Sequence, residues 1–215
     1  MQPMKISFLS SAFLLATVSS QASLVVTGVL DGTLSGGNPK AVIITATADI
    51  ADLSIFGLGS ANNGGGSGGE EFTFPTAGAS TGDVFVVAAN ASSATFFNAH
   101  YLGLNIFTTS TTNINGDDAI ELFESGSVID TYGEIDVDGN GTAWEYADGY
   151  AVRTGGVAGS FDAANYNIAH DDLVGLDEAA HAALIQSVFN FTPVPEPGTA
   201  VLGGIALLTI LRRRR

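Results

Sequence analysis

Short runs of apolar, β-branched or aromatic residues recur along the middle of the chain, and turn-forming residues separate them. Runs of this kind, broken by Gly, Asn, Asp and Pro, are typical of β-strands. Strands at this spacing predict an all-β sandwich or barrel. The predicted strands are Leu24–Leu30, Ala41–Thr47, Leu53–Leu58, Glu71–Phe74, Val84–Ala88, Ala119–Phe123, Val128–Tyr132 and Gly149–Arg153.

The clearest local signal is the stretch AIELFESGSVIDTYGE, in which two strand-like runs flank Ser125 and Gly126. Small residues that tolerate a left-handed backbone favour a tight turn between antiparallel strands. This stretch therefore predicts a β-hairpin.

Helical periodicity appears only near the end of the chain, in the segment DEAAHAALIQSVF. Apolar residues there recur every four positions, at Ala180, Leu184 and Val188. Asp177 precedes them and is a suitable N-cap. We expect one short C-terminal helix in Asp177–Phe189, and this helix and the linker after it occupy residues 177–193.

The N-terminal segment has the three parts of a secretory signal peptide. Lys5 supplies a positive charge, Ile6–Val18 is apolar apart from Ser and Thr, and small residues follow at Ser20 and Ala22. This order predicts a signal peptide over residues 1–22, cleaved by signal peptidase between Ala22 and Ser23.

The C-terminal segment combines a short apolar run with a basic end. Gly198–Leu211 contains 14 uncharged residues and would span about 21 Å as a helix, somewhat less than the roughly 30 Å of a hydrocarbon core. Four arginines follow directly, and the positive-inside rule leaves them in the cytoplasm. Together with a signal peptide, this arrangement places the body of the protein outside the cytoplasmic membrane.

The residues before the apolar run separate this tail from an ordinary anchor. Pro195 and Pro197 flank Glu196, which fixes the local backbone and removes two backbone donors. The whole segment Val194–Arg215 resembles the PEP-CTERM sorting signal of Gram-negative bacteria, in which a Pro-Glu-Pro motif, an apolar helix and a basic cluster follow one another. The matching residues are Pro195, Glu196, Pro197, Arg212, Arg213, Arg214 and Arg215.

The resemblance implies that an exosortase-type membrane enzyme recognises and cuts the tail after a transient stay in the inner membrane. The protein is then released or transferred to the cell surface. In that family such tails accompany exopolysaccharide and biofilm production, so extracellular polysaccharide and other surface proteins are the partners implied.

The charge of the region between the two ends is strongly negative. Only Lys40 and Arg153 remain of the seven bases, whereas 21 of the 22 acids remain, which leaves a net charge of −19. Such a surface repels the phosphates of nucleic acids, so we expect no nucleic-acid partner. It favours divalent cations. The chain contains no cysteine, so burial of apolar side chains must stabilise an exported domain without disulfides.

A second resemblance covers about residues 24–175. The segment NINGDDAIELFESGSVIDTYGEI, preceded by KAVIITATADIADLSIFGLGS, is similar to the lamin-tail domain as it occurs in secreted bacterial proteins. Shared features include Asp52-Leu53-Ser54, Asn115–Asp118, Asp130 and a closing segment that contains Arg153. The resemblance implies an immunoglobulin-like β-sandwich. Val42–Ile44 stands where a Glu-containing strand is usual, which predicts a more buried strand here.

These signals divide the chain into four parts. We expect a signal peptide over 1–22, a lamin-tail-like β-sandwich over 23–176, a short helix and linker over 177–193, and the sorting signal with its transmembrane helix over 194–215.

One short motif could bind calcium. Asp136, Asp138 and Asn140 place oxygen ligands at alternate positions before Gly141, as at the start of an EF-hand loop. The twelfth position, which should carry a bidentate acid, is Ala147. Two interpretations remain open, a calcium-stabilised loop and a solvated turn, and the missing ligand favours the turn.

No motif assigns catalytic residues. We therefore expect a non-enzymatic structural or adhesive module in an exopolysaccharide or biofilm context, with no cofactor except calcium. Two alternatives stay open. One is a glycan-binding module that stacks sugars on Trp144, Tyr146 and Tyr150, although these rings are more typical of core packing. The other is a polysaccharide hydrolase that uses two of the many carboxylates.

Overall fold

The two longest strands form an antiparallel hairpin at the centre of the larger sheet. The protein is described by a computed structural model over residues 22–194. In it, β1 (Leu24–Leu34) pairs with β2 (Asn38–Ala46). Residues Val42–Ile44 of β2 are at most 2% exposed, because this strand is covered on both faces. The burial predicted for this segment is confirmed.

The larger sheet has six strands in the order β11-β10-β1-β2-β5-β7. Its other members are β5 (Val84–Ala88), β7 (Asn105–Thr108), β10 (Tyr150–Arg153) and β11 (Tyr166–Ala169). All neighbours are antiparallel except β5 and β7, which are parallel.

The smaller sheet has four strands in the order β4-β3-β8-β9. These are β3 (Phe56–Ala61), β4 (Phe72–Thr73), β8 (Ala119–Glu124) and β9 (Ser127–Tyr132). The turn between β8 and β9 places Ser125 at φ 51° and Gly126 at φ 77°. Two successive left-handed residues match the right-handed twist of the strands, and the predicted hairpin is confirmed.

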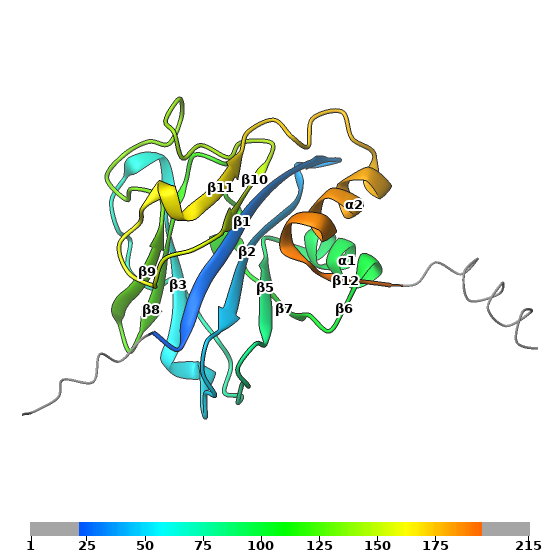
Figure 1. The fold of residues 1–215 in the computed structure, drawn as a ribbon. Coiled ribbons are helices and arrows are strands. Elements are labelled where there is room, and N and C mark those ends of the chain that lie inside the picture. The colour runs from blue at the N-terminus through cyan, green and yellow to red at the C-terminus, as the bar shows by residue number, and fades with distance from the viewer. Residues whose placement is uncertain (1–21, 195–215) are drawn as a thin grey trace, which may run out of the picture.

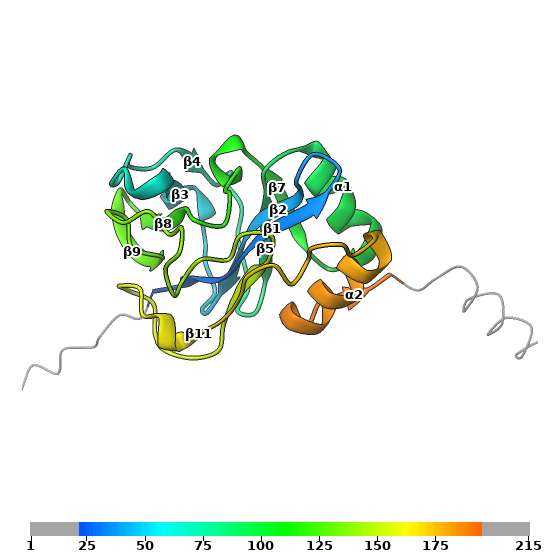
Figure 2. The same cartoon turned by 90° about the horizontal axis from the view of Figure 1, so that it is seen from above.

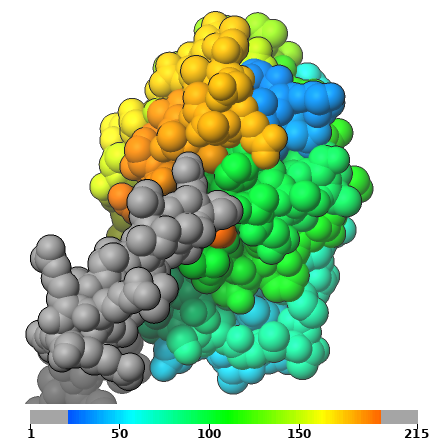
Figure 3. Space-filling model, turned by 90° about the vertical axis from the view of Figure 1, so that its right-hand side faces the viewer, coloured from blue at the N-terminus to red at the C-terminus, as the bar shows by residue number. Residues whose placement is uncertain are grey.

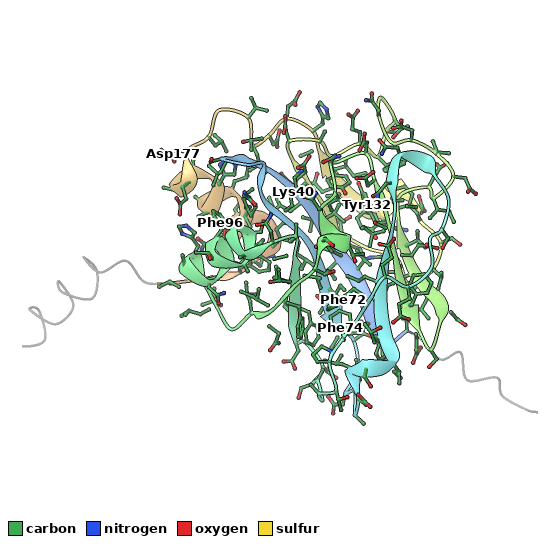
Figure 4. The ribbon with its side chains drawn as sticks, turned by 180° about the vertical axis from the view of Figure 1, so that it is seen from behind. Lys40, Phe72, Phe74, Phe96, Tyr132 and Asp177 are labelled. Carbon is green, nitrogen blue, oxygen red and sulfur yellow. The ribbon has the colours of Figure 1, made fainter. Side chains whose placement is uncertain are left out.

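The main hydrophobic core lies between the two sheets, as Figure 2 shows from above. Inward-facing aliphatic residues of β1, β2, β3 and β8 meet an aromatic group around Tyr132. The ring of Tyr132 makes edge contacts with Trp144, Tyr146, Phe161 and Tyr166, with centroids 5.1–6.2 Å apart. Tyr132 is labelled in Figure 4. The sandwich predicted from the strand pattern is therefore present.

A third layer of two helices covers the outer face of the six-stranded sheet (Figures 1 and 2). The fold is therefore mostly β rather than all-β as predicted. The helix that the sequence pattern did not predict is α1 (Ala91–His100). This helix connects the parallel strands β5 and β7. The Asn90 side chain caps it by accepting a hydrogen bond from the Ser93 N–H at 2.9 Å, and Phe96 and Phe97 face the sheet.

The second helix, α2 (Glu178–Phe189), was predicted. Its N-cap is Asp177, whose carboxylate accepts a hydrogen bond from the Ala180 N–H at 2.9 Å. The centre of its buried face differs from the prediction, because His181 and Ile185 are fully buried while Leu184 and Val188 lie at the edge of the contact. Figure 3 shows α2 in orange beside α1 in green.

Short elements complete the described chain. The predicted strand Leu53–Leu58 begins instead as a 3₁₀ turn, η1 (Leu53–Ile55), because Asp52 accepts a hydrogen bond from the Ser54 N–H at 2.9 Å. The remaining elements are η2 (Asn62–Gly64), β6 (Tyr101–Leu102), η3 (Ser110–Thr112), η4 (Ala163–Asn165) and β12 (Thr192–Pro193). β12 pairs with β6, on the side of the molecule opposite to the start of β1 (Figure 1).

A buried ion pair joins the two sheets. The Arg153 Nη2 group on β10 donates to both carboxylate oxygens of Asp130 on β9, at 2.8 and 2.7 Å. The same carboxylate accepts hydrogen bonds from the backbone N–H groups of Val26 and Gly159 at 2.8 and 2.9 Å. Arg153 also donates through Nε to the Val26 carbonyl and lies over the ring of Tyr166. Residues of four separate segments are thus held at one point.

Candidate functional site

Lys40 is buried in an ion pair, as Arg153 is. The Lys40 ammonium pairs with Asp31 across the β1–β2 hairpin and donates to the Ile114 carbonyl at 2.7 Å. The other oxygen of Asp31 accepts a hydrogen bond from the Asp148 N–H at 3.3 Å. Burial raises the pKa of Asp31 above its ordinary value, while the hydrogen bond and charge of Lys40 oppose this effect. The side chains of Lys40 and Arg153 are only 11% and 10% exposed.

The Asp31–Lys40 pair lies at a cavity of about 790 Å³, which we call the Lys40 cavity. Lys40 is labelled in Figure 4. Asn115 and Asp148 line the cavity as exposed polar groups, and Val174 and Leu176 add apolar surface. Asp148 has φ 51°, a backbone conformation that non-glycine residues adopt rarely and often near binding sites.

The loop predicted to bind calcium lies between β9 and β10, with Asp136, Asp138 and Asn140 all exposed. Asp138 accepts a hydrogen bond from the Asn140 N–H at 3.0 Å, as in a simple Asx turn. Glu145, which follows in the loop, accepts a hydrogen bond from the Gly141 N–H at 2.8 Å. Within residues 22–194, no three His, Cys, Asp or Glu side chains are arranged to hold a metal ion. Calcium binding here stays a prediction.

Asp117 is an unusual carboxylate near this loop. Its Oδ1 atom is shielded from solvent and has no hydrogen-bond partner among the described residues. Burial raises its pKa, and the charges of Asp118, Asp138 and Glu145 raise it further. Adjacent acids before a strand are typical of turns, and Asp118 organises one here by accepting hydrogen bonds from the Asn63 and Asn115 N–H groups, each at 3.0 Å.

The aromatic residues considered for sugar stacking lie in the core. Trp144, Tyr146 and Tyr150 are 3%, 0% and 5% exposed. Their expected role in packing is confirmed. A glycan therefore has no exposed ring to stack on at these three positions.

The predicted processing residues lie mostly beyond residues 22–194. This applies to the signal peptide before residue 22, to Pro195, Glu196 and Pro197, to Arg212–Arg215 and to the predicted transmembrane helix. The predicted cleavage pair itself is described. The carbonyls of Ala22 and Ser23 accept hydrogen bonds from Thr47, at 2.6 and 2.8 Å. Within the described part of the chain, no helix is long and apolar enough to cross a membrane.

Comparisons with known proteins give no relative. No family model, no curated protein and no solved structure matches this chain.

The raised pKa of Asp117 predicts a pH-dependent stability. A carboxyl group whose pKa is higher in the folded state stabilises that state when protonated, and this contribution is lost as the pH rises above the ordinary value of 3.8 through the folded-state value. We expect Asp117→Asn to raise the melting temperature at pH 7, and the difference to disappear near pH 3.5. Calorimetry of both proteins in a chelating buffer measures the melting temperatures at the two pH values.

Glu124→Gln is the matched control for this variant, because it removes one carboxylate from the partly exposed end of β8. Glu124→Gln should not raise the melting temperature at pH 7. An Asp117→Asn protein that melts at or below the wild-type temperature at pH 7 would contradict a raised pKa of Asp117 in the folded protein.

Proposed function

We propose that the protein is exported, processed at both ends and placed at the cell surface or in the extracellular matrix of a Gram-negative bacterium. There its acidic β-sandwich serves a structural or adhesive role and catalyses no reaction. The three-part signals at the two ends of the sequence support export and processing by signal peptidase and an exosortase-type enzyme.

The observation that carries the functional part of the proposal is the placement of charge. The one Lys and the one Arg of residues 22–194 are both buried in ion pairs, so the exterior of this part of the chain carries carboxylates and no exposed Lys or Arg. Such an exterior keeps a protein dispersed at high concentration and attracts cations. Both properties suit a component of a hydrated polysaccharide matrix.

The positions of the first and last strands in the described chain also support processing at both ends. β1 begins at Leu24, directly after the predicted cleavage bond, and β12 ends at Pro193, just before the predicted recognition motif.

We also propose a relationship between this sandwich and the lamin-tail domain. Two of the residues that carry the resemblance, Asp130 and Arg153, meet in the ion pair that joins the sheets. The helices α1 and α2 would then be additions on the outer face of the six-stranded sheet.

Mass spectrometry of the protein from its native host tests the processing. We expect an N-terminus at Ser23 and a C-terminus that lacks Arg212–Arg215, in a surface or extracellular fraction. A variant in which Pro195, Glu196 and Pro197 are all alanine should keep its tail and accumulate in the inner membrane. An intact chain from Met1 to Arg215 in the cytosol would contradict the proposal.

The Lys40 cavity favours a second candidate function, a glycan-binding module. Lys40 has three ammonium protons, and two of them are used within the protein. The remaining proton can be donated to a ligand, while Asn115 and Asp148 can accept from one. Sugar hydroxyls both donate and accept, so they match this mixture of groups.

Binding of the host's purified exopolysaccharide to the full chain tests this candidate. We expect Asn115→Ala to weaken binding by about tenfold, since a lost hydrogen bond leaves its partner group unsatisfied. Asn167→Ala, which changes an exposed Asn on β11, should leave binding unchanged. Absent binding, or equal losses in the two variants, would exclude the Lys40 cavity as a glycan site.

A further inference from the structure

Four carboxylates of the described chain are almost fully buried, and three of them have an evident partner. Asp31 pairs with Lys40, and Asp130 pairs with Arg153. Asp118 accepts hydrogen bonds from two backbone N–H groups. The fourth, Glu121, is 2% exposed and contacts no cation and no backbone donor among residues 22–194.

The side chain of Glu121 points away from the sandwich core. Its neighbours on β8, Ile120 and Leu122, lie in the core between the sheets, and successive side chains of a strand face opposite sides. On the outer side, Ser67 lies in the glycine-rich segment between β3 and β4 and donates a hydrogen bond to the Glu121 Oε2 atom at 2.5 Å. The Oε1 atom accepts no hydrogen bond from the described residues.

Glu121 lines a cavity of about 500 Å³, which we call the Glu121 cavity. Val128 and Val137, which are 45% and 39% exposed, form apolar walls together with Ile135 and Phe161. Two further acids line the cavity as exposed groups, Glu134 and Asp136.

The Glu121 cavity therefore combines three carboxylates with apolar walls and contains no base. An ionised carboxylate that is removed from water without a counter-charge is destabilising, and buried charges are normally paired. Lys40 and Arg153 are the only Lys or Arg residues of the described chain, and both are committed to other carboxylates. No Lys or Arg of residues 22–194 is therefore left to pair with Glu121, and its counter-charge comes from outside this part of the chain.

The walls indicate what kind of cation fits. The described residues offer no group of three acidic or histidine side chains suited to a metal ion. A bare ion would also leave the apolar surface of Val128 and Val137 in water. A hydrocarbon chain that ends in a charged nitrogen covers the walls and places its charge at the carboxylate.

We propose that the Glu121 cavity binds a primary ammonium group on an apolar stem, such as the side chain of an accessible lysine. The ammonium donates to Glu121 Oε1 on the floor, Glu134 and Asp136 add attraction at the rim, and Val128 and Val137 pack on the methylene groups. The site does not depend on the glycan candidate, since none of these residues lines the Lys40 cavity.

Titration of the full chain with Nα-acetyl-lysine methylamide, followed by two-dimensional NMR, tests the proposal. We expect saturable shifts of backbone amides around Glu121, Thr131, residues 133–137 and Phe161. The norleucine analogue, which has the stem without the amine, should bind at least tenfold more weakly, because a hydrogen bond to a charged group is lost. Glucosamine, whose amine sits on a polar ring, should also bind more weakly than the lysine analogue.

The variant Glu121→Gln keeps the shape of the side chain and removes its charge, and it should weaken binding of the lysine analogue by at least about tenfold. Glu124→Gln on the same strand changes the net charge equally but does not line the cavity, so binding should be unchanged. If Glu121→Gln fails to fold, the shift map of the wild-type protein decides alone.

Three results would overturn the proposal. The first is an absence of saturable shifts at these positions. The second is an equal loss of binding in the Glu121→Gln and Glu124→Gln proteins, which would show unspecific charge attraction. The third is saturation of the same amides by calcium chloride with no response to the lysine analogue, which would assign the site to a metal ion.

Discussion

The structure depends on the way in which two bases are used inside a strongly acidic chain. Arg153 from the six-stranded sheet makes a two-point contact with Asp130 of the four-stranded sheet, and the carboxylate is completed by backbone groups of β1 and of the loop at Gly159. A paired charge of this kind tolerates burial only when all its hydrogen-bonding positions are satisfied. It therefore fixes how the two sheets lie on one another.

The same use of charge determines the outside of the molecule. Because Lys40 and Arg153 face inward, the remaining carboxylates of residues 22–194 have no Lys or Arg partner. Most of these carboxylates are exposed and hydrated, which costs little. Asp118 and Glu121 are buried without a Lys or Arg partner, but backbone N–H groups donate to Asp118, whereas Glu121 lies beside apolar walls. The exterior and the Glu121 cavity both follow from the scarcity of bases.

Much of the strand content could be predicted from the sequence, because strands alternate with turn residues over short distances. Val84–Ala88 was predicted with its observed bounds, and the Ser125-Gly126 turn was found because its backbone requirement is local. Helix α1 was not predicted, since ASSATFFNAH has no repeating apolar face and depends on its Asn90 cap and on packing against the sheet.

The binding features were less accessible to prediction. The pairing of Asp130 with Arg153 joins residues 23 positions apart in the chain, and only the packing of the two sheets brings them together. Asp136 and Asp138 have the spacing of calcium ligands, yet Asp136 lines the Glu121 cavity, whereas the charge of Asp138 acts on Asp117. Spacing along a loop does not determine the direction of its side chains.

A double-mutant cycle in urea on the full chain tests the central role of the sheet-joining pair most directly. Asp130→Asn and Arg153→Met should each lower the free energy of unfolding by about 3–5 kcal/mol, because each leaves a buried charge without its partner. The double variant should cost about as much as either single change. Single costs that add to within about 0.5 kcal/mol in the double variant, as distant independent sites do, would contradict this account.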